Sequence, residues 1–336
     1  MNNEKKLRYP EDDIEIIAEL QYDWDKLSDK TLLVSGGTGF IGAFLCDVIR
    51  YRNERYNQNI RVISLSRRGG QGDETVTYLQ KDITTPFSIN DKVDYVIHLA
   101  SNTHPKQYAE DPIGTITTNI YGCDNLLKIA SENRARFLLA SSVEIYGQGT
   151  PTPMDEMYSG FIDCNQARSG YNEAKRVCES LCQAYRSKDG VDVVIARLSR
   201  VFGPDKKEDT KAMSQFMSKA LSGEDVVLKS KGEQRYSYCY VGDAVSGLLK
   251  ILLDGKNGEA YNVSDDDEGM TLYDYAVYIA GLAEKRVILS VEDNNSVSKA
   301  VYALLDTKKL KDLGWSSVYS VKDALKITYQ IMKERR

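Results

Sequence analysis

The sequence has few of the residues that bind metal ions and no segment that indicates a membrane protein. Two histidines and six cysteines occur among 336 residues, and the cysteines lack the Cys-x-x-Cys spacing of zinc and redox sites. No apolar run is long enough to span a bilayer, and the N-terminus lacks a basic-then-apolar signal pattern. We therefore expect no metal site and a reduced, cytoplasmic location.

The charge of the sequence also excludes one class of partner. A net charge of -5 at pH 7 provides no basic surface for nucleic acid, so we expect none to bind. Charged residues make up 28% and hydrophobic residues 42%, which is ordinary for a soluble globular protein. The chain is long enough for one large domain or two modest ones with a sizeable core.

A glycine-rich turn follows the first strand-like run of the sequence. Residues 31–34 are apolar and residues 43–49 have helical periodicity, so the turn lies between a predicted strand and a predicted helix. In this context backbone N–H groups can approach a pyrophosphate at the helix N-terminus. The residues of the turn that we expect to contact a dinucleotide are Gly36, Thr38, Gly39, Phe40, Ile41 and Gly42.

The end of the second predicted strand, residues 61–65, bears on the choice of cofactor. NAD-binding sites usually carry an acidic residue here, which hydrogen-bonds the ribose 2′-hydroxyl. This sequence has Ser66 at about that position, followed by Arg67 and Arg68, and a guanidinium suits a 2′-phosphate. The sequence therefore favours NADP(H), with NAD(H) beside two solvated arginines as the alternative.

Alternating strands and helices predict a doubly wound parallel sheet. Further strands are expected at residues 76–79, 93–101, 137–142 and 191–197, and helices at 115–133 and 169–188. Beyond residue 200 the alternation is lost: helices are expected at 211–222, from Asp243, at 272–283 and at 321–334, and strands at 225–230, 236–241 and 261–263. We predict an α/β fold of Rossmann type with a smaller mixed α/β substrate lobe on its C-terminal side.

The same pattern divides the chain into three parts. Residues 1–30 form an N-terminal helical extension, with one apolar pattern at 14–20 that we expect to lie on the surface. Residues 31–200 form the dinucleotide-binding domain, completed by parts of 236–263. Residues 201–336 form mainly the substrate lobe.

Tyr171 and Lys175 are the strongest candidates for catalysis. They lie four residues apart in a predicted helix and therefore on one face of it. A nearby ammonium favours the ionised phenol, which can exchange a proton with an alcohol or a carbonyl. Taken alone this spacing is common by chance, so the rest of the chain has to support it.

Residues at the ends of other predicted strands are expected to line the cofactor. An aspartate followed by an aliphatic residue could hold the adenine, and small residues let the backbone pass close to the cofactor. His98 lies in an apolar strand and is interpreted as structural. The residues expected at the cofactor are Asp82, Ile83, Leu99, Ala100 and Ser101, with Asn119 as an organiser on the inner face of its helix.

In this order and spacing the motifs resemble the extended short-chain dehydrogenase/reductase family, in its nucleotide-sugar epimerase, dehydratase and decarboxylase branch. The resemblance covers about residues 31–330. Besides the residues above, it rests on Ser142 four residues before Tyr146-Gly147, on Phe202-Gly203-Pro204, and on 232–235 before Tyr240-Val-x-Asp243. UDP-glucuronate decarboxylases look most similar, through Pro105, Tyr108, Asp111-Pro112-Ile113, Thr115, Arg168, Glu173, Arg176 and Leu313-Gly314-Trp315.

The resemblance implies a role for each matched residue. Tyr171 would be the acid/base, Lys175 would tune it and hold the nicotinamide ribose, and Ser142 would hydrogen-bond the same sugar oxygen. Glu144 could act as a base. Arg168, Arg200 and Arg235 would bind a nucleotide-diphosphate sugar, with Arg235 on the phosphates. The helices at 115–133 and 169–188 would form a homodimer contact.

Departures from the family pattern bear on the reaction. Val143 stands where a dehydratase carries the acid partner of Glu144, so dehydration is disfavoured. Residues 299–306 lack the arginine that decarboxylases use for the substrate carboxylate, and Arg200 stands where asparagine is usual. The sequence narrowly favours NADPH-dependent reduction of a nucleotide-linked keto-sugar or ketose, in the synthesis of cell-surface polysaccharide precursors. The alternatives are a 4-epimerase or UDP-glucuronate decarboxylase, and a non-catalytic binding protein.

Overall fold

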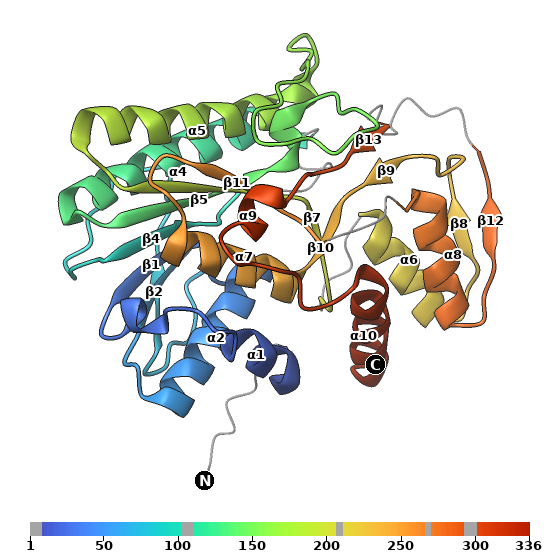
Figure 1. Cartoon of the computed structure of the whole chain (residues 1–336), viewed down its shortest axis with the longest axis horizontal. Helices are drawn as coiled ribbons and strands as arrows, with labels where there is room; N and C mark the ends of the chain where they lie inside the picture. The colour runs from blue at the N-terminus through green and yellow to red at the C-terminus, as the bar shows by residue number, and fades with distance from the viewer. Residues whose placement is uncertain (1–8, 102–109, 206–210, 266–269, 292–300) are drawn as a thin grey trace.

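The computed structural model describes residues 9–101, 110–205, 211–265, 270–291 and 301–336 (Figure 1). Within these residues the largest element is a seven-stranded sheet in the order β11-β6-β5-β4-β1-β2-β3, with every neighbouring pair parallel. Its strands are β1 (Thr31–Ser35), β2 (Arg61–Ser66), β3 (Val76–Gln80), β4 (Tyr95–His98), β5 (Arg136–Ser142), β6 (Val193–Leu198) and β11 (Ala260–Val263). The predicted doubly wound α/β fold is confirmed.

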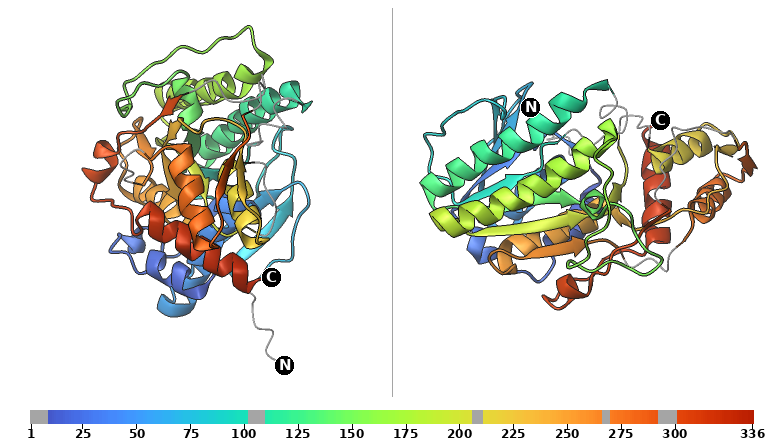
Figure 2. Two further views of the ribbon diagram at one scale, coloured as in Figure 1. Left: turned by 90° about the vertical axis from the view of Figure 1, so that its right-hand side faces the viewer. Right: turned by 90° about the horizontal axis from the view of Figure 1, so that it is seen from above.

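Helices cover both faces of this sheet, as the near-continuous apolar sequence of its strands requires. The helices α4 (Pro112–Asn133) and α5 (Gly170–Asp189) lie side by side on one face, and α2 (Phe40–Tyr56) and α7 (Val241–Asp254) lie on the other (Figures 1 and 2). All five residues of β1 are buried between these layers. Two hydrophobic clusters result, one on each side of the sheet.

The fourth strand is shorter than the predicted 93–101. It runs from Tyr95 to His98, and the Leu99 N–H still donates to the carbonyl of Ser35, the last residue of β1, at 3.1 Å. Ala100 then lies against Gly36 of the glycine-rich turn. Pro105 and Tyr108, which contributed to the family resemblance, lie outside the described residues.

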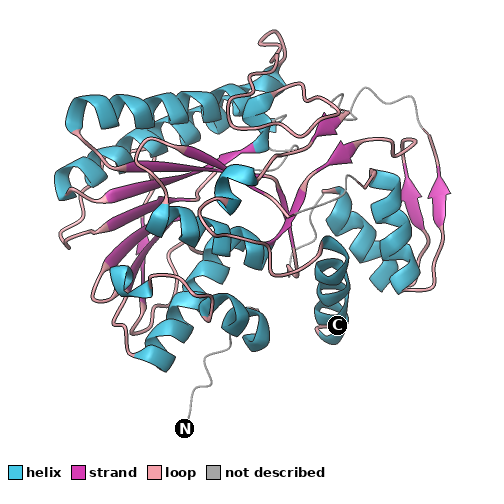
Figure 3. Cartoon of the chain, in the orientation of Figure 1, coloured by secondary structure: helices cyan, strands magenta, loops and turns pink. Residues whose placement is uncertain are grey.

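The C-terminal half contributes a smaller mixed lobe (Figure 3). Its elements are α6 (Ala212–Leu221), β8 (Val226–Leu228), α8 (Leu272–Leu282), β12 (Val287–Leu289) and α10 (Val321–Glu334), whereas the short helix α9 (Lys308–Lys311) packs against β11 of the large sheet. The short parallel pairs β7 (Arg200–Phe202) with β10 (Tyr238–Tyr240), and β9 (Arg235–Tyr236) with β13 (Tyr302–Ala303), lie between the lobe and the large sheet. The prediction of one strand at 236–241 was wrong, because its two halves pair with different partners.

The N-terminal extension contains α1 (Glu11–Ala18) and the short helix η1 (Trp24–Leu27). The expectation that it lies on the surface was wrong, because Ile14 and Ile17 are fully buried where α1 packs against α2 and α7. Asp13 is buried with them and accepts hydrogen bonds from the hydroxyls of Tyr240 and Tyr319, at 2.5 and 2.9 Å. These phenols satisfy a carboxylate that would otherwise be buried unpaired.

No helix in the described residues is both long and apolar enough to cross a membrane. Among the same residues, no three His, Cys, Asp or Glu side chains are grouped so that they could hold a metal ion.

Candidate active site

The glycine-rich turn joins β1 to α2 and is packed too closely for side chains. Gly36 has φ +80°, and a Cβ there would lie 2.9 Å from the backbone nitrogen of Ala100. A Cβ on Gly42, in the first turn of α2, would lie 2.3 Å from the carbonyl oxygen of Gly36. The turn therefore brings bare backbone to the N-terminus of α2, which is the cradle that a dinucleotide pyrophosphate requires.

The ends of β1 and β4 hold each other in place below this turn. The hydroxyl of Ser35 lies 2.7 Å from His98 Nδ1 and also accepts the N–H of Ala100 at 3.2 Å. His98 is fully buried, and burial, with a smaller contribution from the charge of Lys175, lowers its pKa to about 3. A neutral imidazole here fixes the backbone of the cofactor cradle.

Asn119 and Ser101 meet beside the cradle. The Ser101 hydroxyl donates to Asn119 Oδ1 at 2.9 Å, and Asn119 Nδ2 donates to the carbonyl of Thr115 at 2.8 Å. Because Asn119 is fully buried in α4, this contact ties the helix to the chain just after β4. The structure thus brings two of the predicted cofactor residues together.

Asp82 and Ile83 follow β3 at the same edge of the sheet. Asp82 Oδ1 accepts the N–H and the hydroxyl of Thr84, and these hydrogen bonds lower the pKa of the Asp82 carboxyl. The Ile83 side chain is buried against Gly122 of α4. The carboxylate is exposed, so it is accessible to a ligand.

The arginines after β2 are on the surface. Arg67 and Arg68 have exposed side chains, whereas the Ser66 hydroxyl donates to the carbonyl of Gly69 at 3.1 Å. The charge of Arg67 also contributes to the lowered pKa of Asp82, after the Thr84 hydrogen bonds and against desolvation.

The predicted catalytic residues lie at the carboxyl end of β5 and in the first turns of α5. Tyr171 and Lys175 are both buried, and Lys175 Nζ lies 5.9 Å from the centre of the Tyr171 ring. Lys175 Nζ donates to the carbonyl of Ala140 at 2.9 Å, two residues before Ser142. The carboxyl end of a parallel sheet is where α/β enzymes bind ligands, so the fold gives this set a suitable place.

Glu144 and Arg200 meet next to this set. Glu144 lies in η2 (Val143–Tyr146), and its N–H donates to the Ser142 hydroxyl at 3.2 Å. Arg200 Nη2 donates to Glu144 Oε1 at 3.2 Å, while its guanidinium lies 3.9 Å from the centre of the Tyr236 ring. A carboxylate and a guanidinium are therefore placed beside the serine.

Asn172 was not predicted as a site residue. It follows Tyr171 on α5, and its side-chain amide donates to the carbonyl of Glu144 at 2.7 Å and to Glu144 Oε2 at 3.4 Å. It thereby links the catalytic helix to η2. The sequence indicated a role for Asn172 only through its position beside Tyr171, and this position does not reveal that Glu144 is its hydrogen-bond partner.

The other two arginines predicted to bind substrate have exposed side chains. Arg168 lies in η3 (Ala167–Ser169), just before α5, and Arg235 lies in β9. The charge of Arg235 contributes to the lowered pKa of Asp274, after the hydrogen bonds of Thr271. Their roles on the substrate stay predictions.

A second arginine–glutamate pair, also not predicted, anchors the catalytic helix. Arg197 on β6 donates through Nη2 and Nε to the two carboxylate oxygens of Glu179 on α5, at 2.7 and 3.1 Å. The Ser141 hydroxyl donates to Glu179 at 2.6 Å, and Arg197 Nη1 reaches the hydroxyl of Tyr146 and the carbonyl of Glu156. The pair connects α5, β5, β6 and η2 around the predicted catalytic residues.

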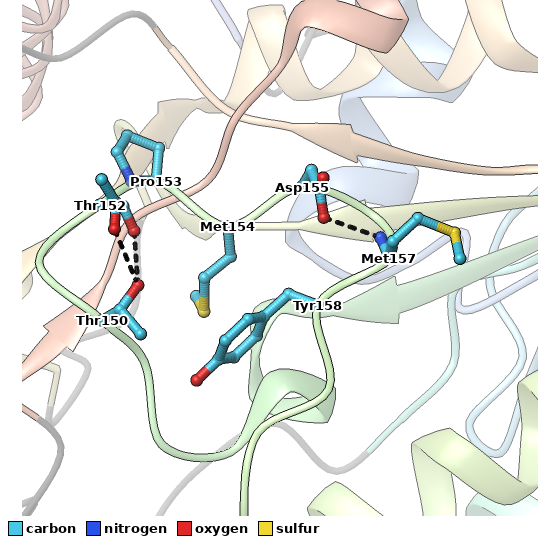
Figure 4. A pocket seen from close by; sticks show the side chains of 7 residues that line it. All are labelled: Thr150, Thr152, Pro153, Met154, Asp155, Met157 and Tyr158. Carbon is cyan, nitrogen blue, oxygen red and sulfur yellow. Dashed lines mark hydrogen bonds between the residues drawn. The ribbon is translucent and has the colours of Figure 1, made fainter.

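A pocket of about 410 Å³ lies elsewhere, within the loop after η2 (Figure 4). Met154 and Tyr158 line it, and the other lining residues are Thr150, Thr152, Pro153, Asp155 and Met157. None of the predicted site residues lines this pocket, so it bears on neither the cofactor nor the catalytic set.

The glycine cradle and the Ser142, Tyr171 and Lys175 set define a nicotinamide-dinucleotide enzyme of the short-chain dehydrogenase/reductase class. Residues 32–264 match the NAD dependent epimerase/dehydratase family, and the chain belongs to this family. The predicted resemblance is thereby confirmed.

Known proteins of this kind resemble the chain along most of its length. UDP-glucuronic acid decarboxylase 5 of Arabidopsis thaliana is 31% identical over 89% of this chain and 88% of its own length. The fold resembles that of a UDP-glucose 4-epimerase from Thermotoga maritima, with a TM-score of 0.77 and 22% identity over 91% of this chain and 99% of that one. It also resembles a UDP-glucuronic acid 4-epimerase from Bacillus cereus, solved with UDP-glucuronic acid and NAD, with a TM-score of 0.76 and 20% identity over 91% and 100%.

Proposed function

We propose that this protein is an internal-redox enzyme that acts on a nucleotide-diphosphate sugar as a 4-epimerase or a decarboxylase. The observation that carries the proposal is the gathering of Ser142, Tyr171 and Lys175 beside a carboxylate, Glu144, at the carboxyl end of β5. The decarboxylase relatives and the epimerase folds support this alternative better than the keto-sugar reduction that the sequence narrowly favoured.

The residues of the site have distinct tasks in this proposal. Tyr171 takes the proton of a sugar hydroxyl, and Ser142 hydrogen-bonds the same oxygen. Lys175, fixed by the carbonyl of Ala140, holds its positive charge 5.9 Å from the centre of the Tyr171 ring. When bound, the nicotinamide supplies the hydride acceptor and donor that no side chain can provide. The tyrosine then returns the proton when the carbonyl is reduced.

The cradle fits a dinucleotide but does not by itself select NAD or NADP. The family description and the solved relative with UDP-glucuronic acid both name NAD, so they do not support the NADP(H) preference expected from Ser66, Arg67 and Arg68. We propose NAD(H). The exposed guanidinium groups of Arg67 and Arg68 keep NADPH-dependent reduction as the second candidate, because a 2′-phosphate could reach them.

The product of the purified protein tests the proposal. We would incubate it with NAD⁺ and with UDP-glucuronate, UDP-glucose or UDP-N-acetylglucosamine, and identify the sugars by proton NMR. A 4-epimer, or carbon dioxide with a UDP-pentose, and no net change of absorbance at 340 nm would support the proposal. Stoichiometric oxidation of NADPH with a keto-sugar, and no product without it, would overturn the proposal in favour of a reductase.

A matched pair of tyrosine variants tests whether the protein is catalytic. Tyr171→Phe removes the proton-transfer group and is expected to lower turnover by at least about 10²-fold, the range typical of general acid–base catalysis. Tyr329→Phe, the same change on α10, is the control and should keep full turnover. Equal turnover in both variants would mean that Tyr171 is not the acid/base and would favour a non-catalytic role for the site.

A homodimer stays part of the proposal. The side chains of Ile113 and Tyr121 on α4, and of Val177 on α5, are apolar and exposed, as a contact between two copies through these helices would require. Light scattering during size-exclusion chromatography would show a particle of twice the chain mass. A particle of single mass over a range of concentrations would contradict this contact.

A further inference from the structure

Arg200 occupies a position between the substrate lobe and the catalytic set. It begins β7, one residue after β6 ends, and its guanidinium lies 3.9 Å from the centre of the Tyr236 ring while Nη2 donates to Glu144. The side chain is 24% exposed and that of Glu144 is 31% exposed. The guanidinium is therefore held in place, but one part of it can be reached from the site.

The hydrogen bonding of this guanidinium is incomplete. Nη1 of Arg200 is buried, and among the described residues it has no hydrogen-bond partner. A buried donor on a charged group is unfavourable when no acceptor faces it, and a guanidinium binds anionic oxygens well because its donors form a planar fork. An acceptor on a ligand would complete the set of hydrogen bonds.

The contact with Glu144 is also weaker than a guanidinium–carboxylate pair can be. Only Nη2 of Arg200 is bonded to it in the described part of the chain, at 3.2 Å, and the second carboxylate oxygen has the Asn172 amide at 3.4 Å. A partly exposed pair of this kind contributes little stability, so a ligand can displace it without a large penalty.

The geometry points to Arg200 as the anion receptor of this active site. It binds an anionic oxygen of the nucleotide sugar by exchanging the Nη2 bond to Glu144 for a bond to the ligand, and the accompanying turn of the guanidinium brings Nη1 to a second acceptor. The Glu144 carboxylate then becomes available beside Ser142. This inference rests on the proposed function, because it takes the ligand to be a nucleotide sugar. It supplies a guanidinium in place of the arginine that is missing from residues 299–306.

Two parts of such a ligand carry the required chemistry. A uronic acid sugar has a carboxylate on its ring, and every nucleotide-diphosphate sugar has phosphate oxygens. Both are anionic acceptors with a geometry that suits a guanidinium fork. UDP, UDP-glucose and UDP-glucuronate share the phosphates, and only the last has the carboxylate, so comparing them distinguishes the two sources.

Calorimetric titration of the NAD-loaded protein with these three compounds tests the inference. Arg200→Gln removes the charge but keeps a polar side chain, and is expected to weaken binding about ten- to hundredfold, the range for a lost charge-assisted hydrogen bond. Weakening confined to UDP-glucuronate assigns the carboxylate, and equal weakening for all three assigns the phosphates. Arg286→Gln, at an exposed arginine of the substrate lobe, is the control and should bind as the unaltered protein does.

Glu144→Gln provides the second arm. Because Glu144 competes for the guanidinium, its neutral variant should bind the anionic ligand more tightly, and this gain should disappear when Arg200→Gln is also present. Dissociation constants within twofold of the unaltered protein for Arg200→Gln, or no binding of any of the three compounds to the unaltered protein, would overturn the inference. Binding is measured without turnover, so normal binding of UDP-glucuronate without any product would count against the proposed function alone.

Discussion

Two arginine–glutamate pairs, whose arginines lie three residues apart on the chain, are built differently. Arg197 and Glu179 share two hydrogen bonds, and their side chains are only 12% and 13% exposed. Arg200 and Glu144 share one in the described residues, and they are 24% and 31% exposed. The first pair is surrounded by protein, whereas the second faces the predicted site.

The surroundings of the two pairs explain what each can do. We call Arg197 and Glu179 the deep pair, and Arg200 and Glu144 the open pair. Every side-chain nitrogen of Arg197 has a partner: Nη1 bonds Tyr146 and Glu156, and the other two bond Glu179. A buried pair with this bonding is strongly destabilising when broken, because its remaining charge is left unpaired. The open pair has a buried nitrogen without a described partner. We therefore expect the same two residue types to serve structure in one place and ligand binding in the other.

The largest effect is expected from Arg197→Lys. Lysine keeps the charge but cannot form the fork to Glu179, and the bonds to Tyr146 and Glu156 are lost as well. We expect the free energy of unfolding to fall by about 3 kcal/mol. Chemical denaturation in guanidinium chloride measures it, and a loss below about 1 kcal/mol would show that the deep pair is not the anchor of α5.

Replacing the arginine of the open pair by lysine should lower catalytic efficiency rather than stability. Arg200→Lys breaks a partly exposed ion pair, so the stability should change by no more than about 1 kcal/mol. Because the fork towards the ligand is lost, kcat/KM is expected to fall at least about tenfold. Steady-state kinetics with the substrate identified by NMR provides the comparison. A large loss of stability without a loss of kcat/KM would assign Arg200 to the scaffold.

A smaller effect is expected from Tyr146→Phe. The Tyr146 hydroxyl donates to Asn262 Oδ1 at 2.6 Å and accepts from Arg197, and the ring is fully buried. Removing the hydroxyl leaves both partners without one bond, for which we expect about 1 to 2 kcal/mol of destabilisation. Substrate binding should be unchanged. Weaker substrate binding in this variant would mean that the deep pair also shapes the ligand site.

The smallest effect concerns pH. Burial raises the pKa of Glu156, although its hydrogen bond with the backbone of Asn262 opposes the shift. Since the folded state holds this proton more tightly than the unfolded state, Glu156 favours folding at acidic pH. Its contribution is lost as the pH rises from 4.5 through the raised pKa.

Glu156→Gln removes this titration. Thermal unfolding midpoints between pH 4 and pH 7 should therefore fall less with rising pH in the variant than in the unaltered protein, relative to their values at pH 4. Parallel curves for the two proteins would show that burial near Arg197 and Glu179 does not raise the pKa of Glu156 in the folded protein.

Local patterns were enough to predict much of the fold and part of the site. Alternating strands and helices indicated the parallel sheet, and the glycine turn was recognisable because its residues are neighbours in sequence. Tyr171 and Lys175 were found for the same reason, since positions i and i+4 share a helix face. The strand order and the participation of β11 in the sheet depend on contacts between distant segments.

What could not be predicted depends on such long-range partners. The burial of α1 requires α2 and α7, which provide the apolar surface that Ile14 and Ile17 contact. Arg197 and Glu179 are eighteen residues apart and looked like two ordinary charges until β6 and α5 brought them together. Arg200 was noticed as a departure from the family pattern, but only the three-dimensional structure shows that its Nη1 has no hydrogen-bond partner among the described residues.

The central claim is that the deep pair supports the fold while the open pair receives the ligand. Thermal unfolding of Arg197→Lys and Arg200→Lys, with and without saturating UDP-glucuronate, tests it in one measurement, because a ligand stabilises the folded state according to its affinity. We predict that Arg197→Lys unfolds at a lower temperature but keeps the ligand-induced rise in midpoint. Arg200→Lys should unfold near the temperature of the unaltered protein and lose most of that rise. The reverse pattern, or a full ligand-induced rise in Arg200→Lys, would contradict the claim.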